Sequence, residues 1–177
     1  GDMDFDYRVK ASLQRLRDIH IWLPLSSLAL HPYKLSIGLF LAEFLCHATR
    51  DEHDNEALFQ FVTFSMQWLD GVERDFSNFH LVFLLRLTRF LGFYPNLDDY
   101  VDGDYFDLRE SVFMRNPPVH RDFLYPEEAQ KVQLMMRMDY PTMHLFRMSH
   151  SERNRLLELS LKYYRLHLQH YMDSRWF

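Results

Sequence analysis

The spacing of hydrophobic residues changes along the chain, from a period of two near the N-terminus to helical spacing beyond it. Apolar and charged side chains alternate over residues 3–9, which is the pattern of a half-buried β-strand. Residues 13–21 form a second strand-like run, with one break in phase that a β-bulge can absorb. We expect the two runs to pair as a hairpin. Because an isolated hairpin is marginally stable in water, this one must lean on the rest of the chain or be the remnant of a larger sheet.

Helical spacing begins at Pro32, a residue that suits the first turn of a helix. It predicts a helix over residues 32–50, with four apolar positions along one face: Leu35, Leu39, Ala42 and Leu45. A second helix follows a short acidic connector and ends near Gly71. A third runs over residues 77–91, where Gly92 and then Pro95 are clear stop signals.

The stretch from residue 96 to residue 126 predicts no long element. Residues 105–108 and 112–114 are expected to form a small hairpin, and the Pro117-Pro118 pair excludes a helix there. Pro126 and the two acids after it begin a fourth helix, because negative charge is favourable at the positive end of the helix dipole.

The C-terminal part of the pattern predicts one short element and one long helix. Residues 140–146 are expected to form a short helix or turn. Ser149 and Glu152 have the spacing of a capping box, in which each side chain satisfies a backbone N–H of the first turn. The last helix should follow and extend to about Tyr171. The chain is therefore predicted to be mainly α, a helical bundle with an N-terminal and a small internal β-hairpin.

Composition agrees with a helical domain that has a large aromatic core. The 177 residues include 16 Phe, 10 Tyr, only 5 Gly and only 7 Pro. Few Gly and Pro favour long uninterrupted elements, and large rings bury much area each. The formal net charge is −5, so no overall basic charge points to nucleic acid. The charge is uneven, however: residues 96–128 carry nine acids and three bases, whereas residues 129–177 carry eight bases and four acids.

Cysteine and hydropathy narrow the class of protein further. Cys46 is the only cysteine, so neither an intramolecular disulfide nor a cysteine-based zinc ribbon is possible, and we expect a buried structural thiol. No apolar run reaches the roughly 20 residues of a membrane span, so we expect no membrane association. The chain begins with Gly1 and lacks an initiator Met, so we expect a fragment whose first residue is a cleavage scar.

No arrangement of residues predicts catalysis, a metal site or a cofactor. The histidine pairs with helical spacing, His167 with His170 and Glu43 with His47, lack a third ligand nearby in the sequence. The sequence also contains neither a nucleophile motif nor a glycine-rich phosphate loop. We therefore expect a protein without enzymatic activity, without a bound metal and without a cofactor.

Two groups of basic residues are candidates for binding. Arg86 and Arg89 lie three apart on the third helix, among apolar residues that include Phe90. They either grip an acidic, aromatic peptide or form a solvated outer face. Four bases of the last helix form either a backbone-binding stripe for nucleic acid or ordinary solvated charge: Arg153, Arg155, Lys162 and Arg165.

Four segments carry a resemblance to a known family. FHLVFLLRLTRFLGFYPNL (residues 79–97) resembles the hallmark of RecO, a recombination mediator, in which a long apolar helix ends in a leucine-glycine pair. PYKLSIGLFLAEFL (32–45) is similar to the helix that opens the RecO helical domain. GDYFDLRESVF (103–113) resembles the small hairpin of RecO proteins of the Bacteroides type. YYRLHLQHYMDSRWF (163–177) is similar to the closing helix of RecO and the segment after it, where Ser174 stands at the serine position.

The resemblance implies a domain organisation and a function. Residues 1–24 would be the last two strands of the N-terminal OB-fold, and residues 25–177 the C-terminal helical domain. RecO proteins bind single-stranded DNA, anneal complementary strands, and act with RecR in the RecFOR pathway of DNA repair and recombination after DNA damage. With RecR they load RecA onto strands coated by the single-strand-binding protein SSB, and the helical domain of some members holds the acidic, Phe-ending tail of SSB. A cytoplasmic, nucleoid-associated protein is therefore implied. The alternative is an unrelated helical adaptor for protein partners.

One departure from the family pattern concerns zinc. Many RecO proteins carry a four-cysteine zinc site after the leucine-glycine stretch, but residues 100–114 of this chain contain no cysteine. We therefore expect either a hairpin that packs without metal, supported by Tyr105, Phe106 and Phe113, or a mobile loop.

Overall fold

The computed structural model describes residues 26–168 except 50, 51 and 53, and it divides the chain into two compact units at Asp75 and Phe76. The predicted N-terminal hairpin, and residues 1–24 as a whole, lie outside the described residues. The prediction of a mainly α chain with a small β-hairpin region is confirmed.

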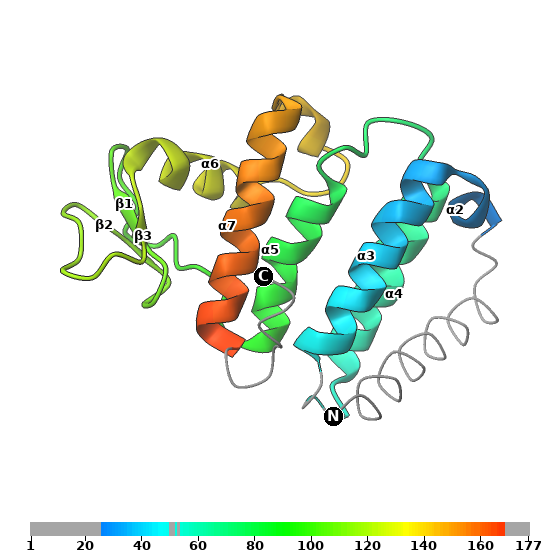
Figure 1. The fold of residues 1–177 in the computed structure, drawn as a ribbon, viewed down its shortest axis with the longest axis horizontal. Helices are drawn as coiled ribbons and strands as arrows, with labels where there is room; N and C mark the ends of the chain where they lie inside the picture. Colours follow the sequence, from blue (N-terminus) through cyan, green and yellow to red (C-terminus); the bar gives the residue numbers. More distant parts are fainter. Residues whose placement is uncertain (1–25, 50–51, 53, 169–177) are drawn as a thin grey trace. The chain divides into compact units, whose positions relative to one another are not determined.

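The first unit contains three helices, α2 (Ser26–Leu30), α3 (Pro32–Ala48) and α4 (Glu56–Gly71), shown in blue to cyan-green in Figure 1. Pro32 begins α3 as predicted, whereas the short helix α2 was not predicted. The ammonium of Lys34, which is only 2% exposed, donates to the Ser27 hydroxyl and to the Asp70 carbonyl, both at 3.0 Å. One buried cation thus links all three helices. Its hydrogen bonds offset the cost of burying the charge.

The predicted apolar face of α3 is only partly correct. Ala42 is buried, but the side chains of Leu35 and Leu39 are 39% and 55% exposed. The helix carries apolar residues nearly all round, so spacing alone does not select the buried side. Close packing selects it: a Cβ atom added at Gly38 would lie 3.2 Å from a methyl group of Leu28 on α2.

The second unit packs four elements around one core: α5 (Phe79–Leu91), α6 (Pro126–Met136), α7 (His150–Leu168) and a three-stranded antiparallel sheet. Figure 1 shows α5 and α7 side by side, with α6 beside the sheet. The strands are β1 (Tyr105–Asp107), β2 (Val112–Met114) and β3 (Phe123–Leu124), in the order β2-β1-β3, and a 3₁₀ turn (Met143–Leu145) precedes α7. The predicted hairpin is confirmed as β1 and β2, whereas β3 was not predicted.

Local signals define the helix ends of this unit as the sequence predicted. Gly92 ends α5 in the left-handed conformation, with φ of 93°, which glycine adopts without steric cost. At the start of α7, the Ser149 backbone N–H donates to the Glu152 carboxylate at 2.7 Å. The Glu152 N–H in turn donates to the Ser149 hydroxyl at 3.1 Å. The capping box is therefore complete.

Candidate partner and nucleic-acid contacts

The three predicted partner-binding residues lie on one side of α5 but have different surroundings. Arg86 is half-buried, and its guanidinium donates to the carbonyl of Met138, just after α6. Arg89 is exposed, and its guanidinium carbon lies 4.5 Å from the centre of the Tyr94 ring, a cation–π contact. Phe90 is half-buried. Arg86 therefore joins α5 to the chain just after α6, whereas Arg89 presents its charge to the solvent.

Arg153 is set apart from the other predicted nucleic-acid-binding residues. It is half-buried near the start of α7, and its guanidinium donates to the Met148 carbonyl at 2.8 Å. Its charge also contributes to lowering the pKa of His80 on α5. The position two residues before Arg155 places it on a different side of the helix, so it does not extend the stripe that the others form.

Arg155, Lys162 and Arg165 share one side of α7, and acidic side chains pair with Arg155 and Lys162. Arg155 pairs with Glu128 of α6 at 3.1 Å and with Glu158 at 3.5 Å. Lys162 pairs with Asp122 at 3.3 Å. Hydrogen bonding from Arg109, and then from Lys162, lowers the pKa of Asp122, so this carboxylate stays ionised. The stripe therefore has alternating charge rather than one sign.

Residues that the sequence did not single out fix the sheet beside α7. The Asp107 carboxylate accepts from the backbone N–H of Arg109 at 2.9 Å and of Glu110 at 3.1 Å, and pairs with His120. On α7, the Tyr163 hydroxyl donates to the Phe93 carbonyl, and it lies 2.6 Å from the Ser111 hydroxyl. An Asp whose carboxylate accepts from the N–H groups two and three residues further on is typical of a turn of this kind.

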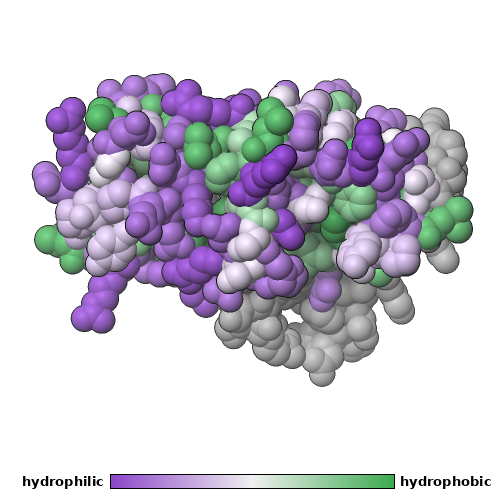
Figure 2. Space-filling model, turned by 90° about the horizontal axis from the view of Figure 1, so that it is seen from above, coloured by the Kyte–Doolittle hydropathy of each residue, from purple (hydrophilic) through white to green (hydrophobic). Residues whose placement is uncertain are grey.

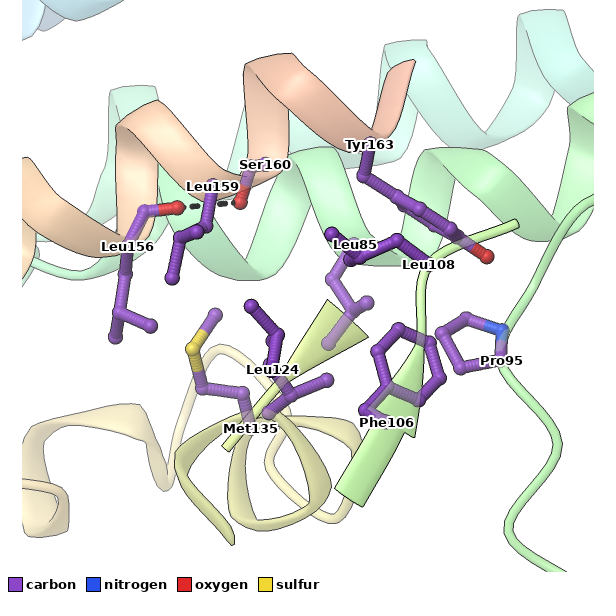
Figure 3. A pocket seen from close by; sticks show the side chains of 11 residues that line it. Leu85, Pro95, Phe106, Leu108, Leu124, Met135, Leu156, Leu159, Ser160 and Tyr163 are labelled. Atoms are coloured by element: carbon purple, nitrogen blue, oxygen red, sulfur yellow. Dashed lines mark hydrogen bonds between the residues drawn. The ribbon is translucent and has the colours of Figure 1, made fainter. Parts of the chain in front are cut away.

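A small cavity of about 40 Å³ lies inside the second unit (Figure 3). Its walls come from α5, α6, α7 and the sheet and are almost entirely apolar. Of the two hydroxyl groups among the lining residues, that of Ser160 donates to the Leu156 carbonyl within its own helix at 2.8 Å, and that of Tyr163 donates to the Phe93 carbonyl. The lining side chains are Leu85, Pro95, Phe106, Leu108, Leu124, Val132, Met135, Leu156, Leu159, Ser160 and Tyr163. A cavity of this size without free polar groups is a packing defect rather than a site for chemistry.

The cysteine and the histidines considered above are the remaining candidates for chemistry. Cys46 is buried, as predicted for a structural thiol. The ring of His167 stacks on Phe93 at 4.8 Å and lies 2.8 Å from the Leu108 carbonyl, while His170 lies outside the described residues. Within the described part of the chain, no three His, Cys, Asp or Glu side chains come together in a way that could hold a metal ion.

The face of the molecule shown in Figure 2 is mostly polar, and no described helix could span a membrane. Figure 2 shows hydrophobic residues in separate small areas among hydrophilic ones on one face of the molecule. Among the described helices, none has the length and apolar character that crossing a membrane requires. Binding on the face shown in Figure 2 would therefore depend on charges and single rings rather than on one broad apolar area.

Comparisons with known proteins give a consistent result. The family model described as "Recombination protein O C terminal" matches residues 30–175. A protein of Phocaeicola vulgatus named DNA repair protein RecO is 50% identical over 167 residues, which cover 94% of this chain and 69% of that protein. The protein of the same name from Bacteroides fragilis is 48% identical over 168 residues, with the same shares, and that of Porphyromonas gingivalis is 34% identical over 171 residues, 92% and 70% of the two chains. No solved structure gave a significant match.

Proposed function

Because the chain belongs to the RecO family of DNA repair proteins, we propose that it acts as a non-enzymatic recombination mediator. In this role it binds single-stranded DNA, the acidic tail of SSB and RecR, promotes strand annealing, and assists the loading of RecA in the cytoplasm, at the nucleoid. The observation that carries the proposal is the family match along residues 30–175. The same match argues against the alternative of an unrelated helical adaptor. That residues 1–24 complete an OB-fold is part of the proposal.

Arg89 is the residue of α5 that we propose contacts the SSB tail. An acidic peptide that ends in Phe needs a cation for its carboxylates and an apolar neighbour for its ring. Arg89 is exposed, and Phe90 follows it in the sequence. Stacking on Tyr94 holds the Arg89 guanidinium in place, while its N–H groups remain at the exposed surface. Arg86 would act indirectly, because its bond to the Met138 carbonyl holds the chain after α6 against α5.

The first prediction concerns this contact. Arg89→Ala should weaken binding of a labelled SSB C-terminal peptide about tenfold, because a hydrogen-bonded charge contributes roughly 1.5–3 kcal/mol. Fluorescence anisotropy titrations would measure it, with Arg147→Ala, which removes another exposed arginine, as the matched control. Equal affinities of wild type and Arg89→Ala would leave the family assignment unaffected and exclude Arg89 as the contact for the SSB tail. No binding by either would mean that recruitment of SSB depends on other parts of the protein.

For nucleic acid, we propose that Arg155, Lys162 and Arg165 of α7 contact the phosphate backbone. Their spacing lets them follow one strand, and the positive balance of residues 129–177 supports the assignment. The acids limit the contributions of Arg155 and Lys162, since a phosphate must compete with Glu128 and Glu158 for the first and with Asp122 for the second. Arg153 would contribute least, because it already bonds to a backbone carbonyl.

The second prediction tests the stripe. Lys162→Ala should weaken binding of labelled single-stranded DNA several-fold and reduce the slope of log affinity against log salt by roughly 0.7, because one phosphate contact is lost. Lys131→Ala is the matched control: Lys131 lies on α6 and also pairs with an acid, Glu152, at 3.5 Å. If both variants reduce the slope equally, the contact is not specific to α7, and the assignment is wrong.

A further inference from the structure

The outer face of the small sheet carries an unexplained group of aromatic side chains. In strand β1, Phe106 points to the core, so its neighbour Tyr105 points to the opposite face. Phe123 of β3 lies on the same face, since it pairs with Asp107. The rings of Tyr105, Phe123 and Tyr125 lie 5.2–5.9 Å apart, and Tyr125 is 65% exposed. These three rings are called the aromatic face below.

A hollow of about 470 Å³ adjoins the aromatic face. Met114 lines the hollow and is the cross-strand partner of Tyr105, which places the hollow next to the aromatic face. Asp98, Asp99 and Asp104 also line it, against one cation, Arg115. Asp104 is used internally, because its carboxylate accepts the backbone N–H of Val101 at 2.9 Å. Within the described part of the chain, the exposed carboxylates of Asp98 and Asp99 make no hydrogen bond or ion pair.

The charge around these rings determines which partner they fit. Aromatic platforms bind either the bases of single-stranded nucleic acid or cationic side chains. A strand of nucleic acid would have to run through a region in which nine acids outnumber three bases over residues 96–128. Phosphates are repelled by such a field, whereas guanidinium groups are attracted to it. Ring faces that are negative at their centres, beside carboxylates without partners, match arginine in both respects.

We propose that the aromatic face and the adjoining hollow bind an arginine-rich segment of a partner protein. One guanidinium stacks on the exposed Tyr125 ring, and the next one pairs with Asp98 and Asp99 in the hollow. This contact is separate from the SSB and DNA contacts of α5 and α7, and it does not depend on them.

The test uses the whole chain and a fluorescein-labelled peptide of alternating arginine and glycine, with binding measured by anisotropy. Tyr125→Ala should weaken binding about three- to tenfold without a change of net charge, because it removes the stacking surface. The control is Tyr33→Ala, which removes a ring that is 74% exposed in the first unit. The pair Asp98→Asn with Asp99→Asn should weaken binding as much, whereas Glu43→Gln with Glu73→Gln, which removes the same charge from exposed sites of the first unit, should not.

Three outcomes would overturn the proposal. Absence of saturable peptide binding to the wild type is the first. The second is equal weakening by the control variants, which would mean that the peptide senses only net charge. The third is displacement of the peptide by single-stranded DNA together with loss of DNA binding in Tyr125→Ala, which would assign the rings to bases instead. A peptide of alternating lysine and glycine should bind less tightly than the arginine peptide, because ammonium groups stack poorly on rings.

Discussion

Phe106→Ala is expected to lower the free energy of unfolding by about 4 kcal/mol, the middle of the range for loss of a buried aromatic ring. Phe106 is 1% exposed in the central strand β1. Its ring lies 4.8 Å from that of Phe113 and 5.9 Å from that of Tyr163 on α7. The ring also lines the existing cavity, so its removal enlarges a space that the surrounding elements have not closed. Urea denaturation followed by circular dichroism would measure the loss.

The matched control for this prediction is Phe59→Ala, because Phe59 lies on α4 and is 56% exposed. It should cost less than about 1 kcal/mol, since little apolar area returns to water. A loss below about 1 kcal/mol for Phe106→Ala as well would mean that the sheet is not part of the cooperative core. The sheet would then unfold independently of α5, α6 and α7.

The prediction for Phe106 bears on how a hairpin without cysteine is held. The sequence left two possibilities open, a hairpin that packs without metal and a mobile loop. The structure has a packed hairpin: Phe106 and Phe113 face the core, and Tyr105 lies on the outer face. A third strand, β3, completes the sheet, and the Asp107 carboxylate fixes the turn between β1 and β2. Ring packing and a side-chain-capped turn therefore hold the strands.

Elements whose signals are local could be predicted from the sequence. The start of α3 at Pro32, the end of α5 at Gly92 and the capping box at Ser149 each depend on residues within one helical turn. By contrast, β3 has only two residues and no period of its own, and it forms because β1 offers an unpaired edge. The buried side of α3 was missed for the same reason, since α2 selects it by packing against Gly38.

The candidate sites show the same division between local and long-range information. Helical spacing correctly placed Arg86 and Arg89, and also Lys162 and Arg165, on shared sides of their helices. It did not reveal the partners of these bases, which lie far away in the sequence: Met138 for Arg86, Glu128 for Arg155 and Asp122 for Lys162. The partners decide which bases are available, so Arg89 is a better candidate for peptide binding than Arg86.

The last prediction concerns pH. Burial, assisted by the charge of Arg153, lowers the pKa of His80 on α5 to about 4. The unfolded chain has a His pKa of about 6.5, so between these values the unfolded state binds more protons than the folded state. Stability should therefore fall as pH decreases below about 6.5, and this contribution of His80 should level off near pH 4. From about pH 7 to about pH 5 it amounts to about 2 kcal/mol.

His80→Leu should remove this dependence, and it leaves no hydrogen-bonding partner behind, because the buried Nδ1 of His80 has none. The measurement is the free energy of unfolding in urea at the two pH values. The wild type should lose about 2 kcal/mol more than His80→Leu. His144→Leu, at an exposed histidine, should behave like the wild type. If the wild type and His80→Leu lose the same amount, His80 is hydrated or protonated in the folded protein, and the side of α5 that carries it is open to water.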